Sequence, residues 1–197
     1  SSDLDEISKY KNSEFFNTDV KVECANAFYT NGEAEKAKEL LAQCNSNDEN
    51  ALLLKGKIKF DEKNLDEAKE IFSTIGKNSQ NPEVLNFLGL FDLENMNFID
   101  AIKNFSKASN LDKSNSKYFY NLANAYFYNG WIDEAQKAYS KALYLNPDNI
   151  DYRYSLAYLY FDKADFTKAK KEIDAILDIN PDYSQARVLR ALLLSKK

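Results

Sequence analysis

Residues 116–149 read SKYFYNLANAYFYNGWIDEAQKAYSKALYLNPDN and contain two amphipathic patterns separated by a turn signal. In the first half, apolar side chains recur at steps of three and four, as on one face of a helix: Phe119, Leu122, Ala123 and Tyr126. Asn129 and Gly130 interrupt this pattern, and a second set follows: Ile132, Ala135, Tyr139 and Ala142. Pro147 ends the second pattern, because proline lacks an N–H and clashes with the preceding turn. The stretch therefore predicts two helices joined by a tight turn.

The same pattern recurs along most of the chain when its 34 positions are numbered from Ser116. Position 8 is always small: Ala25, Gly56, Gly89, Ala123, Ala157 and Ala191. Position 20, twelve residues later, is always alanine: Ala37, Ala68, Ala101, Ala135 and Ala169. Position 24 is large and apolar: Leu41, Phe72, Phe105, Tyr139 and Ile173. Small residues let two helices approach closely while large ones fill the space beside them, so the pattern predicts a repeated helix pair.

This pattern resembles the tetratricopeptide repeat, which has a 34-residue period and small and aromatic residues at these positions. The resemblance covers roughly residues 18–197. It implies an all-α fold, a right-handed superhelical solenoid of antiparallel helix pairs. The chain departs from the family pattern in two ways, because position 4 is never tryptophan and the closing proline occurs only at Pro147 and Pro181.

We expect one domain over residues 1–197, with eleven or twelve helices in about five repeats. The expected repeats lie near residues 18–48, 49–81, 82–115, 116–149 and 150–183, followed by a capping helix at 184–197. Residues 1–17 fit either half a repeat or an N-terminal cap. At position 11, Lys59 and Asp92 replace the aromatic residue, which indicates either rotated first helices or a repeat phase that is wrong by one residue.

The last expected helix combines apolar and cationic positions. We expect Ala191, Leu192 and Leu193 to face inward, whereas Arg187 and Arg190 stand where a following second helix would pack. This arrangement predicts a solvating cap, since terminal units of a solenoid need a polar outer face. Leu194 at position 11 leaves a second possibility, a docking point for another subunit.

Few residues of the chain could carry chemistry. Histidine, the commonest general base and metal ligand, is absent, and no phosphate-binding glycine motif occurs. We therefore expect no catalytic residue, no cofactor and no metal. The net charge of −5 argues against nucleic acid as a partner, and no run approaches the ~18 apolar residues of a membrane span. Cys24 and Cys44 fit buried free thiols or a disulfide, so the compartment stays open, with the cytoplasm slightly favoured over export.

By resemblance to the family, positions 2, 5, 9, 12 and 13 of the first helices line the concave face of the solenoid. The middle of this face is rich in aromatic residues, and we expect the partner-binding groove there: Asn86, Leu90, Leu93, Tyr120, Asn124, Phe127, Tyr128, Tyr154, Tyr158 and Phe161. The competing interpretation is that curvature buries these rings against neighbouring helices. The Asn124 amide could donate to and accept from a bound backbone, while Glu83, Asp151 and Asp162 at the edges favour a neutral or basic ligand.

The expected function is a non-catalytic scaffold that binds a protein or peptide segment in this groove. Self-association through the terminal helices is the alternative, and an enzyme is a third, disfavoured possibility.

Overall fold

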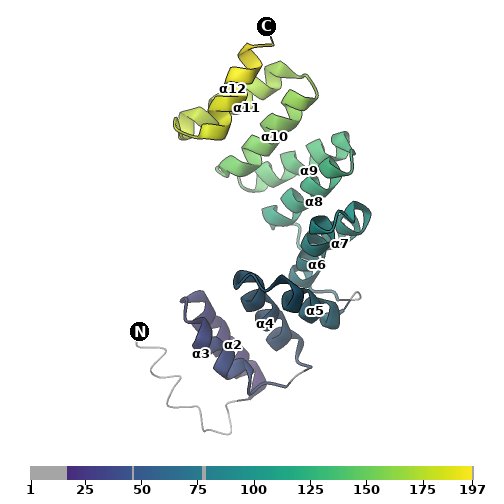
Figure 1. Ribbon diagram of the computed structural model, residues 1–197, viewed down its shortest axis with the longest axis vertical. Helices are drawn as coiled ribbons and strands as arrows, with labels where there is room; N and C mark the ends of the chain where they lie inside the picture. The colour runs from purple at the N-terminus through teal and green to yellow at the C-terminus, as the bar shows by residue number, and fades with distance from the viewer. Residues whose placement is uncertain (1–16, 46, 77–78, 197) are drawn as a thin grey trace. The chain divides into compact units, whose positions relative to one another are not determined.

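The computed structural model describes residues 17–45, 47–76 and 79–196, which form helices and no strand (Figure 1). The described helices are α2 (Thr18–Thr30), α3 (Ala34–Leu41), α4 (Glu49–Asp61), α5 (Leu65–Ile75), α6 (Pro82–Glu94), α7 (Phe98–Leu111), α8 (Ser116–Tyr128), α9 (Ile132–Leu145), α10 (Ile150–Asp162), α11 (Phe166–Ile179) and α12 (Ser184–Leu194). The expectation of an all-α repeat fold is confirmed. The half-repeat or cap expected over residues 1–17 lies outside the described residues, apart from Asn17.

The chain divides into two compact units, Ser1–Ser79 and Gln80–Lys197, here called the N-terminal and C-terminal units. In the C-terminal unit, α6 packs on α7, α8 on α9 and α10 on α11, and each pair contacts the next pair. Helix α12 packs on both α10 and α11. One continuous domain stays a prediction. All residues of the expected groove belong to the C-terminal unit.

The first helices of the repeats begin after an asparagine or aspartate that caps them. In α8, the Asn115 Oδ1 accepts from the Lys117 backbone N–H at 3.1 Å. In α10, the Asn149 Oδ1 accepts from the Tyr152 N–H at 2.9 Å. Each cap satisfies an N–H that has no partner inside the helix, so it fixes where the helix begins and which residues share its exposed face.

Close packing within the pairs α4–α5 and α6–α7 shows that the repeat phase is right in the two repeats with a polar residue at position 11. An added Cβ on Gly56 would lie 2.8 Å from the Phe72 ring, and one on Gly89 would lie 2.7 Å from the Phe105 ring. Positions 8 and 24 therefore meet as expected, and the alternative of a one-residue error is wrong.

The polar residues at position 11 pair with the second helix of their own repeat. The Lys59 Nζ lies 2.8 Å from the Glu67 carboxylate, and the Asn104 amide donates to Asp92 at 2.8 Å. A polar contact thus takes the place of the aromatic packing found in other repeats, which explains Lys59 and Asp92 without any shift of register.

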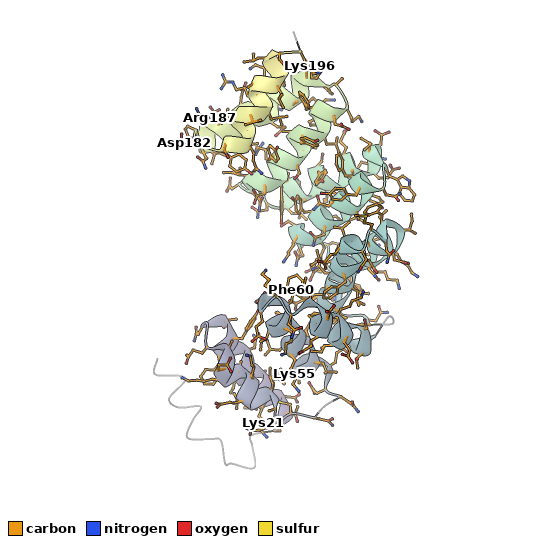
Figure 2. The ribbon with its side chains drawn as sticks, in the orientation of Figure 1. Lys21, Lys55, Phe60, Asp182, Arg187 and Lys196 are labelled. Atoms are coloured by element: carbon orange, nitrogen blue, oxygen red, sulfur yellow. The ribbon has the colours of Figure 1, made fainter. Side chains whose placement is uncertain are left out.

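Helix α12 differs from the sequence expectation in the residues that it buries. It packs on the preceding repeat through Ala186, Leu189 and Leu193, whereas Ala191 and Leu192 are exposed. The expectation that Ala191 and Leu192 face inward is wrong. Position 8, that of Ala191, is buried only when a second helix covers it, and Leu192 stands at position 9, which is also exposed at Tyr158. Asp182 and Arg187 lie at the start of this helix and Lys196 just beyond its other end (Figure 2).

Cys24 is buried and Cys44 half-buried, and both are free thiols, so the disulfide alternative is not formed in this structure. Burial raises the pKa of both thiols. Among the described residues, no helix is long and apolar enough to cross a membrane.

Candidate functional site

Rings from α8 and α10 meet on the C-terminal unit. The Phe127 ring contacts the edge of Tyr158 at a centroid distance of 6.1 Å, and Tyr158 lies 6.5 Å from Tyr154 on the next turn of α10. Phe127 also contacts Tyr128 at 5.8 Å. Because α8 and α10 are the first helices of successive repeats, position 12 of one helix lies beside position 9 of the next, and Tyr128 and Tyr154 join through their neighbours on the same helix. The structure therefore brings these four expected groove residues together.

Two further rings extend this surface at its ends. Phe98, the first residue of α7, stacks on Tyr128 with centroids 6.1 Å apart. Tyr183, just before α12, lies 5.9 Å from Tyr154. Neither was expected, because Phe98 begins a second helix and Tyr183 ends a repeat, and both positions lie outside the concave set of the family pattern. We call the connected rings the aromatic strip: Phe98, Tyr128, Phe127, Tyr158, Tyr154 and Tyr183.

The aromatic strip is partly open to solvent. The Tyr128 side chain is 61% exposed and Tyr158 is 43% exposed, while Phe127, Tyr154 and Tyr183 are half-buried. Burial against neighbouring helices, the competing interpretation, therefore does not describe Tyr128 and Tyr158. It fits the half-buried rings in part, since Tyr154 and Phe127 also pack against the core of the unit.

Tyr120 and Asn124 are held by contacts within the fold. Tyr120 stacks on Tyr152 at 4.5 Å, and its hydroxyl lies 3.2 Å from the Ser155 Oγ. The buried Tyr139 hydroxyl donates to the Asn124 Oδ1 at 2.6 Å. Burial raises the pKa of Tyr139, which keeps this hydroxyl protonated and donating. The Asn124 Oδ1 is therefore already occupied, and mainly the NH₂ group remains to bind a ligand. The sequence had predicted that both a donor and an acceptor would be available.

Asn86 does not line an open surface. It is only 2% exposed, and its Oδ1 accepts from the Asn121 amide at 2.7 Å in the contact between α6 and α8. Its short side chain ends inside this contact, so the expectation that Asn86 faces a ligand needs correction. Leu90 and Leu93 are half-buried against the core of the unit.

Phe161 is also half-buried, and its ring contacts Phe166 at 5.8 Å. Among the described residues, no ring contact joins Phe161 to the aromatic strip. It therefore lies on the same helix as Tyr154 and Tyr158 without extending their ring-to-ring contacts.

Helix α12 exposes two apolar side chains that are not among the groove residues expected from the sequence. Val188 is 60% exposed and Leu192 is 48% exposed. They occupy positions 5 and 9, the positions of Tyr154 and Tyr158 in the preceding repeat. The signal was present in the sequence, but the interpretation of α12 as a cap left these positions out.

The aromatic strip is uncharged at neutral pH, and carboxylates stand beside it. The Tyr183 hydroxyl donates to the Asp151 Oδ1 at 2.9 Å. The pKa of Tyr183 is raised to about 12, mainly by burial and next by this hydrogen bond. Burial also raises the pKa of Tyr154. The tyrosines therefore offer apolar ring faces and hydroxyl groups, and the described residues contain no cluster of histidine, cysteine or acidic side chains that could hold a metal ion.

Comparisons with known proteins identify the repeat. Residues 127–193 match the family model described as tetratricopeptide repeat. YrrB, whose crystal structure is described as a tetratricopeptide repeat protein with an unusual peptide-binding site, is 19% identical, with 93% of this chain and 97% of that one covered at a TM-score of 0.74. PilF of Pseudomonas aeruginosa is 19% identical, with 89% and 90% covered at a TM-score of 0.69.

A third similar structure, the Cut9–Hcn1 hetero-tetramer of the APC/C, is 22% identical at a TM-score of 0.80 and covers 97% of this chain but 39% of that one. At these identities the likeness concerns the fold. No curated protein sequence matches the chain.

Proposed function

Because the chain carries tetratricopeptide repeats, we propose that it is a non-catalytic scaffold that binds a protein or peptide segment on the aromatic strip of its C-terminal unit. Repeats of this family generally bind proteins or peptides and perform no chemistry. The single observation that supports the choice of surface is the connected set of rings in which Tyr128 and Tyr158 remain exposed.

The physical chemistry of the aromatic strip suits recognition. Tyrosine offers a large apolar area with a polar tip and loses little rotamer freedom on binding, which is why it is enriched at binding hot spots. The rings already contact one another, so a ligand would not have to order them. Tyr120 and Asn124 belong to α8 as well, and contacts with Tyr152 and Tyr139 hold their side chains in place. YrrB, described as having a peptide-binding site, gives an analogy from the same fold.

The proposal is tested by selecting random 12-residue peptides on the purified chain and counter-selecting on a Tyr128→Ala/Tyr158→Ala variant. Peptides should be enriched that bind the native chain and not the variant. A Tyr144→Ala variant is the matched control, because Tyr144 is 77% exposed on α9 and belongs to no part of the aromatic strip. Peptides that bind all three proteins equally would contradict the proposal.

Self-association is the second candidate function, and one observation favours it. Leu194 is 55% exposed at a surface hollow, and the hollow is lined by apolar residues such as Leu177 and Ala191 together with the charged residues Asp178, Asp182, Arg187 and Arg190. A second copy that covers this hollow would bury Leu194 and could pair its charged side chains. Sedimentation equilibrium tests this function. A mass that stays near 22.6 kDa at all concentrations would exclude self-association. A mass that rises with concentration in the native chain, and rises less in the Leu194→Glu variant, would support it.

A further inference from the structure

One face of α10 combines tyrosine rings with carboxylates. Asp151, Tyr154, Tyr158 and Asp162 follow one another at steps of three, four and four residues, so they share a single stripe of the helix. Both aspartates and Tyr158 are exposed, and Tyr154 is half-buried. The Tyr183 hydroxyl donates to Asp151 while its ring contacts Tyr154, which holds this carboxylate beside the rings.

The two carboxylates have no cationic partner among the described residues, where no lysine or arginine nitrogen lies within 4.0 Å of either. Neighbouring lysines of the chain are engaged elsewhere. The Lys163 Nζ lies 2.7 Å from Asp133, and the Lys168 Nζ lies 2.7 Å from Asp165. This stripe therefore presents two uncompensated negative charges next to open tyrosine rings.

We propose that the α10 stripe holds a cationic side chain, arginine or lysine, of the segment bound on the aromatic strip. The inference rests on the proposed function and specifies the chemistry of the partner. A cation over the face of a tyrosine is attracted by the ring quadrupole, and the flanking carboxylates complement its charge. Arginine suits the site best, because its planar group stacks on rings and donates to carboxylates at the same time.

The chain shows that such contacts form on its own rings. The Lys168 Nζ lies 5.4 Å from the Tyr160 ring centroid, and the Lys141 Nζ lies 5.1 Å from that of Tyr144. A purely apolar segment on the stripe would instead desolvate Asp151 and Asp162 without any compensating charge, which is unfavourable.

The test uses peptides from the display selection that lose binding to Tyr158→Ala. Each is synthesised in two forms, one with its basic residues and one with arginine replaced by neutral citrulline and lysine by acetyl-lysine. Both forms are titrated into the native chain and into Asp151→Asn/Asp162→Asn. A matched control, Glu134→Gln/Asp178→Asn, removes the same charge from the second helices α9 and α11.

We expect the selected peptides to be rich in arginine or lysine, and neutralising either the peptide or the stripe to weaken binding about tenfold. Neutralising both should weaken it little further, and the control variant should bind like the native chain. Selected peptides without basic residues, or equal affinity of both forms, would overturn this inference and leave the proposed function standing. If no peptide depends on Tyr158, the proposed function fails and the inference with it.

Discussion

At the scale of single residues, the contact between positions 8 and 24 sets how closely the two helices of a pair approach. Glycine stands at position 8 where position 24 is phenylalanine, as in the pair Gly89 and Phe105. Alanine stands there where position 24 is leucine, tyrosine or isoleucine. The geometry gives the reason, because an added Cβ on Gly89 would lie 2.7 Å from the Phe105 ring, which is fully buried.

We therefore expect Gly89→Ala to lower the free energy of unfolding by about 1–2 kcal/mol, since overpacking outweighs the gain of about 1 kcal/mol in helix propensity. Urea denaturation measures the loss. The double variant Gly89→Ala/Phe105→Leu reproduces the Ala25 and Leu41 pair of the first repeat, so it should lose less than the sum of its single changes. Strict additivity would contradict this explanation.

A second expectation at this scale concerns the turns between paired helices. Position 15 is left-handed in every described repeat, with φ of 81° at Gly32 and 80° at Gly130 but 63° at Lys63, 61° at Met96 and 58° at Ala164. A side chain in this conformation costs roughly 1–2 kcal/mol. Met96 is 76% exposed, so removing its side chain loses little packing.

Met96→Gly should accordingly raise the free energy of unfolding by about 1 kcal/mol. The reverse change, Gly130→Ala, should lower it by a similar amount, because no atom lies within 4 Å of the added Cβ and only the backbone conformation matters. Thermal denaturation of both variants gives the answer, and an unchanged melting temperature in both would refute the argument.

At the scale of helices, the sequence predicted well which side chains share a face and less well how deeply each is buried. Periodicity correctly placed Tyr154 and Tyr158 on one stripe of α10, because a helical step of four residues is fixed by geometry. The same rule put Asn86 on the exposed face of α6, yet this side chain ends beneath α8. Depth depends on the neighbouring helix and on side-chain length, which a family pattern does not specify.

The buried amide contact between α6 and α8 should stabilise their packing. Asn121→Ala would leave the Asn86 amide buried without its partner, at a cost of about 1–3 kcal/mol. Asn86→Ala/Asn121→Ala should cost less than the sum of the two single changes, because no unpaired amide remains. Urea denaturation of the native chain, Asn86→Ala, Asn121→Ala and the double variant measures this difference. Purely additive losses of unfolding free energy would show that the two amides do not interact.

The stability of the protein should also depend on alkaline pH, through Tyr118 of helix α8. Burial, with smaller contributions from Glu83 and Asp112, raises the pKa of Tyr118 to about 12. An unfolded tyrosine ionises near pH 10, so the stabilising contribution is fully present below about pH 10 and is lost as the pH rises through about 12.

At pH 11 the ionisation of Tyr118 should lower the free energy of unfolding by about 1 kcal/mol. Tyr118→Phe should therefore lose less stability than the native chain between pH 8 and pH 11 in urea denaturation. The absorbance of tyrosinate, compared between the two proteins, should place the ionisation of Tyr118 near pH 12. An equal loss of stability in both proteins would count against a raised pKa in the folded state.

At the scale of the whole chain, the repeat pattern predicted the fold because small and large positions recur at a fixed spacing. The aromatic strip could be predicted only in part. Phe127, Tyr128, Tyr154 and Tyr158 came from the concave positions. Phe98 enters through a contact with the next repeat, and Tyr183 through a contact between the last residue of a repeat and its first helix. The two ends of the strip thus depend on contacts that the concave positions of the family pattern do not include.

The most direct test of the central claim is calorimetric titration of a peptide selected on the native chain into native, Tyr158→Ala and Tyr144→Ala proteins. We predict that Tyr158→Ala weakens binding by about 1–3 kcal/mol with helicity and stability retained, while Tyr144→Ala binds like the native chain. Ala135→Leu serves as the packing control, since overpacking a buried contact costs roughly 1–3 kcal/mol of stability. If Tyr158→Ala binds as tightly as the native chain, or unfolds as readily as Ala135→Leu, the aromatic strip is not a binding surface.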